Sequence, residues 1–119
     1  GIPVMEQGSH LKGASAVIEK DRAAGLLAKE LDADVLMFIT GVSNVVLNYG
    51  SDHPINIDKM TTADAARYAE EGHFKTGSML PKVESSIDFI NAGKGRRAII
   101  TSLDGAKSAL AGKGGTTIQ

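Results

Sequence analysis

Two lysines of this sequence each lie where a helical pattern of residues begins. Lys20 stands between Glu19 and Asp21, directly before a run of apolar residues at helical spacing. The helix macrodipole disfavours a cation at that end by roughly 0.3–1 kcal/mol. A bound anion reverses this effect, because helix N-termini and ammonium groups both attract phosphate. The pattern fits a phosphate contact in which Asp21 holds the ammonium group. It also fits an ordinary exposed lysine beside a first-turn aspartate.

Lys82 repeats this arrangement further along the chain. Gly77 and Ser78 permit close approach of a ligand to the backbone, and Pro81 is favoured at the first position of a helix. Lys82 then falls in the first turn, where its charge suits a phosphate better than it suits the helix. A Gly-Ser turn followed by a solvated lysine explains the same residues. Two such cases in one short chain favour the phosphate interpretation.

Thr40, Gly41 and Val42 follow the most apolar segment of the sequence. Residues 35–39 are continuously apolar, which predicts a strand over 34–40 that is buried on both faces. Ligands of open α/β sheets bind beyond the carboxyl ends of the strands. Gly41 either admits a flat ring at this place or makes a tight turn.

Several other patterns predict no site. Residues 93–98 match G-x-G-x-x-A but follow a helical pattern and open a strand, the reverse of a dinucleotide-binding loop. His10, His53 and His73 are far apart in the sequence, so we expect surface or loop histidines and no metal cage. The sequence contains no cysteine, which excludes thiolate ligands and nucleophiles. We expect Arg96 and Arg97 to flank a strand as a solvated pair without a role.

The elements that position these residues alternate between strands and helices, which predicts an α/β layered sheet. A polar connection over 6–13 follows the first strand. The first helix is predicted by apolar residues that recur at helical spacing, which are Ala23, Ala24, Leu26, Leu27 and Leu31. Thr61 with Asp64 resembles a capping box. The expected strands are 2–5, 34–40, 45–47, 98–101 and 116–118, and the expected helices are 21–32, 61–71, 81–90 and 103–110, with a loop over 48–54.

Composition sets limits on the class of protein. The chain has 119 residues, of which 42% are hydrophobic, and its 13 Lys+Arg and 14 Asp+Glu give a net charge of −1. We therefore expect one domain over 1–119, no nucleic-acid partner and no membrane span. The lack of cysteine fits a cytoplasmic location. A sequence that opens with Gly-Ile-Pro-Val, without a starting Met, suggests part of a larger protein.

Together these segments resemble carbamate kinase, in the amino acid kinase superfamily. The opening GIPV resembles the end of that family's GGGGIPV stretch, and residues 13–21 are similar to its GVEAVIDKD segment. Residues 40–42 with 47–50 are similar to TGV…INYG, and residues 98–103 to AIITSL. The most specific match is GHFKTGSMLPKVE over 72–84, which resembles GHFAPGSMLPKIE.

The resemblance implies a three-layer αβα sandwich of which this chain is the C-terminal, nucleotide-binding part. It implies reversible phosphoryl transfer between ATP and carbamate, giving ADP and carbamoyl phosphate, in the arginine metabolism of a homodimeric enzyme. Lys20 would neutralise charge on the transferring phosphoryl group, Asp21 would orient the catalytic lysines, and Lys82 would bind the nucleotide phosphates. The other residues expected at the nucleotide are Thr40, Gly41, Val42, Tyr49, Gly77, Ser78 and Met79.

The resemblance also leaves alternatives open. A Mg²⁺ ion would bridge the phosphates with few protein ligands. Family members are more than twice as long as this chain, so the chain alone should lack a complete active site. A non-catalytic nucleotide-binding module is one alternative. Another amino acid kinase, such as a glutamate or uridylate kinase relative, is a second, although residues 72–82 argue against it.

Overall fold

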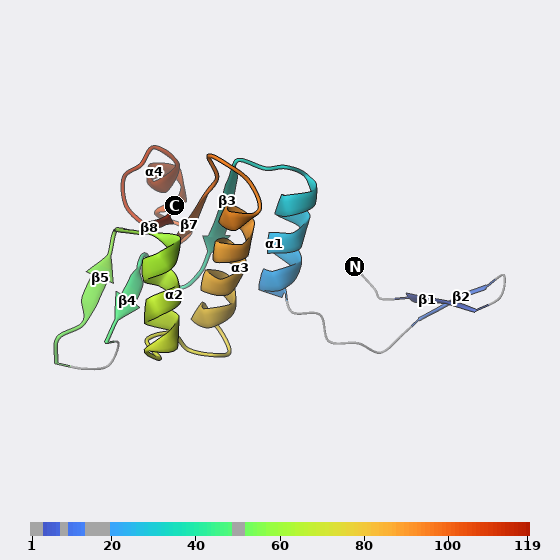
Figure 1. Cartoon of the computed structure of the whole chain (residues 1–119), viewed down its shortest axis with the longest axis horizontal. Helices are drawn as coiled ribbons and strands as arrows, with labels where there is room; N and C mark the ends of the chain where they lie inside the picture. The colour runs from blue at the N-terminus through green and yellow to red at the C-terminus, as the bar shows by residue number, and fades with distance from the viewer. Residues whose placement is uncertain (1–3, 8–9, 14–19, 49–51) are drawn as a thin grey trace.

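The computed structural model describes residues 4–7, 10–13, 20–48 and 52–119 (Figure 1). Strands β1 and β2 form an antiparallel hairpin, and β4 pairs antiparallel with β5. The strands are β1 (Val4–Gln7), β2 (His10–Gly13), β3 (Val35–Ile39), β4 (Val45–Leu47), β5 (Ile55–Ile57), β6 (Lys59–Met60), β7 (Arg97–Thr101) and β8 (Thr116–Ile118). The helices are α1 (Lys20–Glu30), α2 (Thr62–Glu70), α3 (Met79–Asn91) and α4 (Ala106–Leu110).

The main sheet has the strand order β3-β7-β8-β6. Strands β3 and β7 are parallel, so that Ile39 lies opposite Thr101 and both strands end at the same edge of the sheet. Strand β7 is buried from Ala98 to Thr101. Strand β3 was predicted to be buried on both faces, which is wrong: Leu36 is buried but Ile39 is 51% exposed. Among the described residues β3 is an edge strand, and its side chains alternate between the core and the surface.

Helices α1, α3 and α2 lie side by side, with α3 in the middle (Figure 1). Helix α1 approaches α3 closely because Gly25 has no side chain: a Cβ atom there would lie 3.0 Å from Cβ of Ser85. The helix that the apolar spacing predicted is confirmed, but most of those apolar residues do not face the core. Its buried residues are Asp21, Gly25 and Ala28, whereas the exposed side chains include Leu26, Leu27 and Leu31.

Several predicted helix ends are confirmed, with small shifts. Thr61 caps α2, accepting a hydrogen bond from the Asp64 backbone N–H, and the capping box is complete. Helix α3 begins at Met79 after Ser78, so Pro81 is its third residue rather than its first. Pro81 is tolerated there because the first-turn N–H groups have no partner within the helix. Helix α4 begins three residues later than expected, at Ala106.

Three short strands were not predicted. Strand β2 lies in the segment 6–13 that polar residues marked as a connection, and β5 and β6 follow the expected loop. They contain few residues each, and β6 has only Lys59 and Met60. Runs this short and polar give no clear apolar alternation, so the pairing of β2 with β1, of β5 with β4 and of β6 with β8 defines these elements instead. Among the described helices, none has the length and apolar character needed to cross a membrane.

Arg96 was predicted to be solvated, and the structure corrects this. Its side chain is 7% exposed and pairs with Asp32, with Nη2 2.6 Å from Oδ1. Arg96 Nη1 donates to the Phe89 backbone oxygen at 3.1 Å, and the guanidinium lies over the Phe89 ring. The side chain thus joins the end of α3 to the turn after α1, because a guanidinium carries enough donors for several acceptors.

Candidate functional site

A pocket of about 270 Å³ opens beyond the carboxyl end of β3. Thr40 continues the pairing of β3 with β7, since its backbone N–H donates to the Thr101 oxygen at 2.8 Å. The chain then leaves the sheet at Gly41, where an added Cβ would meet nothing within 4 Å. The pocket is lined by Thr40, Gly41, Val42, Asn44, Val46, His73, Lys75, Ser78 and Met79.

The pocket brings together two of the segments that the sequence predicted to bind a ligand. Thr40, Gly41 and Val42 come from the end of β3, while Ser78 and Met79 come from the start of α3. These segments are far apart in the sequence, and the fold brings them together around one pocket. Gly77 precedes the lining residue Ser78 but does not itself line the pocket. Tyr49 lies outside the described residues.

Four lining residues were missed: Asn44, Val46, His73 and Lys75. Asn44 and Val46 follow the predicted turn by only a few residues, but nothing in their types marked them. His73 and Lys75 lie in the 72–84 segment that carried the family resemblance, so that segment held the available signal. His73 had been expected to be a surface or loop histidine, and its side chain is 19% exposed at the pocket wall.

The N-terminus of α3 forms part of this wall without a side-chain cap. Ser78 is the N-cap residue but makes no side-chain cap hydrogen bond, and the first turn contains no acidic residue. Helix N-termini leave backbone N–H groups that attract anions. The start of α3 therefore offers a negatively charged ligand a favourable contact at the edge of the pocket.

Asp21 and Lys82 form a buried ion pair beside the pocket. Lys82 Nζ lies 3.0 Å from Asp21 Oδ2, and the two side chains are 9% and 7% exposed. Lys82 Nζ also donates to the backbone oxygen of Ser78 at 3.4 Å, which links the pair to the pocket wall. Asp21 is the second residue of α1 and Lys82 the fourth of α3, so the two helices begin side by side.

Lys20 is the first residue of α1 and is exposed. It directly precedes Asp21, whose carboxylate contacts Lys82. The backbones of Lys20 and Lys82 therefore lie at the same end of the layer that α1 and α3 form. Burying a charge without a partner of opposite sign would lower the stability of the fold by roughly several kcal/mol. Asp21 supplies that compensation for Lys82.

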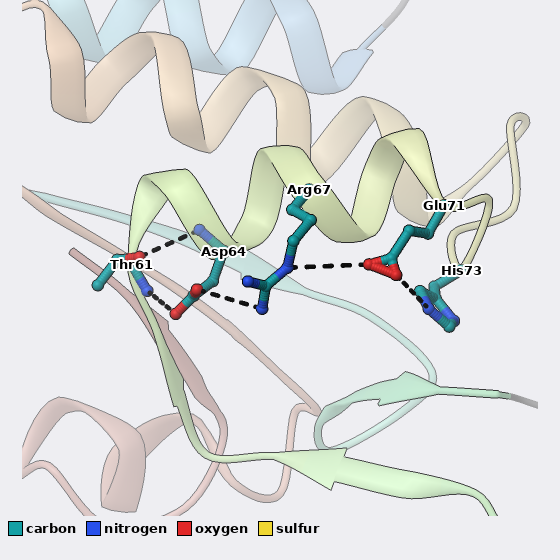
Figure 2. A network of polar contacts seen from close by, with 5 residues as sticks. All are labelled: Thr61, Asp64, Arg67, Glu71 and His73. Atoms are coloured by element: carbon teal, nitrogen blue, oxygen red, sulfur yellow. Dashed lines mark hydrogen bonds and ion pairs between the residues drawn. The ribbon is translucent and has the colours of Figure 1, made fainter.

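A second group of polar contacts runs along α2 to His73 (Figure 2), which lines the pocket. Arg67 Nη2 lies 3.4 Å from Asp64 Oδ1, and Arg67 Nε lies 3.8 Å from Glu71 Oε1. The Arg67 side chain is 60% exposed. A hydrogen bond with the Tyr68 side chain raises the pKa of Arg67 above its ordinary value. Glu71 Oε2 in turn lies 3.8 Å from His73 Nε2.

His73 is held from both sides of its ring. The Asn48 backbone N–H donates to Nδ1 at 3.4 Å, so in this arrangement Nδ1 is an acceptor. On the other side of the ring, Nε2 faces Glu71. The ring also meets Tyr68 edge-on, with centroids 5.9 Å apart. These contacts fix one wall of the pocket to α2.

The described residues provide few side chains that could bind a metal ion. The described residues contain no group of three His, Asp or Glu side chains that could hold a metal. Mg²⁺ commonly keeps its waters and binds substrate phosphates with one or two carboxylates.

Comparison with known proteins decides the family. The family model described as "Amino acid kinase family" matches residues 1–102. The chain belongs to the amino acid kinase family. It is 49% identical over 118 residues to the carbamate kinase-like protein YqeA of Escherichia coli K12 and 48% identical over 118 residues to the carbamate kinase of Thermococcus kodakarensis. These matches cover 99% of this chain, but only 38% and 37% of the two relatives.

Solved structures agree with these relatives. The carbamate kinase of Giardia lamblia bound to AMP-PNP superposes with a TM-score of 0.89 at 42% identity, over 99% of this chain and 37% of that chain. A further structure of the Giardia carbamate kinase gives a TM-score of 0.85. The predicted α/β amino acid kinase fold and the resemblance to carbamate kinases are thus confirmed. The chain spans between a third and two fifths of the length of these relatives.

Proposed function

We propose that the full-length protein is a carbamate kinase and that this chain is its C-terminal, nucleotide-binding part. The reaction would transfer a phosphoryl group reversibly between ATP and carbamate, giving ADP and carbamoyl phosphate. The names of the relatives support the substrate, and the pocket beside a buried Lys–Asp pair supports the chemistry. The observation that carries the proposal is the 3.0 Å contact between Lys82 and Asp21 at the paired helix starts.

The pocket suits a nucleotide because its apolar and charged parts lie on different segments. Val42, Val46 and Met79 provide apolar side chains that can pack against a flat ring. The start of α3 at Ser78 provides the site for phosphates. A base against the valines and phosphates at α3 would direct the terminal phosphate toward Lys82.

The charged residues would act by holding and neutralising phosphate. An ammonium group has three N–H donors. Two donors of Lys82 reach Asp21 and Ser78, so within the described residues one is left for a phosphate oxygen. Lys20, exposed at the start of α1, would neutralise charge on the transferring group, and Asp21 would orient the lysines. Phosphoryl transfer depends mostly on such positioning and charge neutralisation, and Mg²⁺ bound to the phosphates would assist.

The decisive test measures ATP formation from carbamoyl phosphate and ADP by the full-length protein. Lys20→Ala and Lys82→Ala should each lower kcat by about a hundredfold or more, since each removes a group that stabilises developing charge. Lys107→Ala is a matched control, because Lys107 is an exposed lysine of the short helix α4. Circular dichroism should show that the variants are folded. Near-normal turnover in both folded test variants would contradict the assigned roles.

A non-catalytic nucleotide-binding module is the second candidate. It requires only a pocket for the nucleotide, such as the one that nine residues of this chain line. Calorimetry with ADP, together with the turnover assay on the full-length protein, separates the two functions. ADP binding without any phosphoryl transfer by the full-length protein would support the module and contradict the kinase.

A further inference from the structure

Asn44 has an amide group whose orientation its neighbours determine. Its Nδ2 lies 3.1 Å from the Ile57 backbone oxygen and 2.9 Å from the Gly115 backbone oxygen. The Asp58 carboxylate oxygen Oδ1 lies 3.5 Å away on the same side. All three neighbours are hydrogen-bond acceptors, so a rotated amide would place Oδ1 of Asn44 against oxygen atoms. The NH₂ end therefore faces these partners, and the position of Oδ1 is fixed.

The surroundings of Asn44 hold this arrangement in place. The next residue, Val45, is fully buried, and its N–H donates to Thr116 Oγ1 at 2.8 Å. Thr116 Oγ1 in turn donates to the Ile57 oxygen, so Asn44 and Thr116 share an acceptor on β5. The start of β4 is thus tied to β5 and to the segment leading into β8. A side chain held in this way is preorganised to recognise a ligand.

The amide oxygen of Asn44, Oδ1, is available to a ligand in the pocket. Asn44 lines the pocket, and in the described part of the chain no hydrogen bond to its Oδ1 is formed. Both protons on Nδ2 have backbone acceptors, so Asn44 offers the pocket an acceptor and no donor. Val42 and Val46 lie on either side of it in the sequence and also line the pocket. The acceptor thus stands in the part of the wall that suits a flat ring.

We propose that Asn44 Oδ1 accepts a hydrogen bond from the exocyclic amine of a purine and so makes the pocket prefer a 6-aminopurine nucleotide. The proposal rests on the nucleotide-binding function proposed above and adds the residue that recognises the base. A base with a carbonyl group at that place would put an oxygen against Oδ1, which disfavours its binding. The specificity comes from the clamped amide, since a freely rotating asparagine could serve either base.

The test removes the amine from the ligand and the amide from the protein in turn. Calorimetry on the full-length protein compares ADP with purine riboside 5′-diphosphate, which has hydrogen in place of the amine. Wild type should bind ADP about threefold to tenfold more tightly, as expected for one hydrogen bond. Asn44→Ala should bind the two ligands nearly equally. Val46→Ala is the matched control from the same wall and should weaken both ligands while keeping their ratio.

Loss of the Nδ2 contacts could unfold Asn44→Ala, so Asn44→Ser is made in parallel. Its hydroxyl can donate to one backbone acceptor but is too short to replace the amide oxygen, and it should also abolish the preference. A wild-type ratio near one, or a ratio that persists in a folded Asn44 variant, would overturn the role of Asn44 and leave the nucleotide site intact. Absence of any ADP binding by the wild-type protein would overturn the proposed function as well.

Discussion

Two groups of charged residues in this chain differ in their contact with water. The Asp21–Lys82 pair joins α1 to α3 with both side chains less than 10% exposed, at 7% and 9%. The contacts of Asp64, Arg67 and Glu71 run along a single helix, with 39–60% of each side chain exposed. Burial strengthens electrostatic attraction and also raises the cost of leaving a charge unpaired. We therefore expect the first group to control stability and chemistry, and the second to have only a local effect.

Breaking the buried pair should have the largest effect. Asp21→Asn removes the carboxylate and leaves the Lys82 ammonium buried without its charged partner. The free energy of unfolding should fall by about 3–5 kcal/mol, the usual cost of removing one partner from a buried pair. Urea unfolding followed by circular dichroism measures this loss. A loss below about 1 kcal/mol would show that the pair behaves like a surface contact.

The double variant Asp21→Asn/Lys82→Met controls for the role of charge. It removes both members of the pair, so its stability should recover part or all of the loss seen in Asp21→Asn. Phosphoryl transfer by the full-length protein should be lowered as far as in Lys82→Ala, because the phosphate-binding ammonium is gone. Recovery of stability together with activity would contradict the proposed role of Lys82.

Local patterns predicted those parts of the fold that short segments determine. The capping box at Thr61 depends on a few adjacent residues and was found where the sequence placed it, and α3 ends at Asn91, one residue beyond the predicted end. The burial of Arg96 could not be predicted in this way. It depends on Asp32 and on the end of α3, and the fold alone brings these three places together.

The apolar face of α1 shows the same limit. The spacing of its apolar residues predicted the helix but not its buried side, because close packing against α3 requires small residues, and Gly25 and Ala28 occupy the contact. The pocket residues show the same difference between local patterns and contacts that only the fold creates. Thr40 and Ser78 were predicted from chain position beside a strand end and a helix start, whereas Asn44 and Val46 needed the pocket itself to be recognised.

Filling the pocket should have the next largest effect. Gly41→Val places a branched side chain at a position where an added Cβ meets nothing within 4 Å of the chain. The substitution should leave the fold unchanged and weaken ADP binding about tenfold or more, since the new methyl groups occupy ligand space. Calorimetry measures the affinity, and Gly41→Ala should give an intermediate value. Unchanged affinity in Gly41→Val would show that the nucleotide lies elsewhere.

The capping box should contribute less than the buried pair. Thr61→Ala removes the acceptor of the Asp64 N–H, and loss of an N-cap costs about 1 kcal/mol of stability. Thr61→Ser keeps the hydroxyl and should retain most of the stability. Thermal unfolding of the three proteins gives the comparison. A loss in Thr61→Ala as large as that in Asp21→Asn would contradict the distinction between the two regions.

The exposed contacts of Arg67 should have the smallest effect. Arg67→Gln removes its pairs with Asp64 and Glu71 but keeps a long polar side chain on the helix. Exposed pairs gain little, because water and salt screen the charges and ordering the side chains costs entropy. The melting temperature should stay within experimental error of wild type at physiological salt, and ADP affinity should not change. A clear loss of ADP affinity would instead show that Glu71 needs Arg67 to hold His73 at the pocket wall. In that case the exposed contacts of α2 would also help to form the nucleotide site, and they would differ from the buried pair only in the size of their effect.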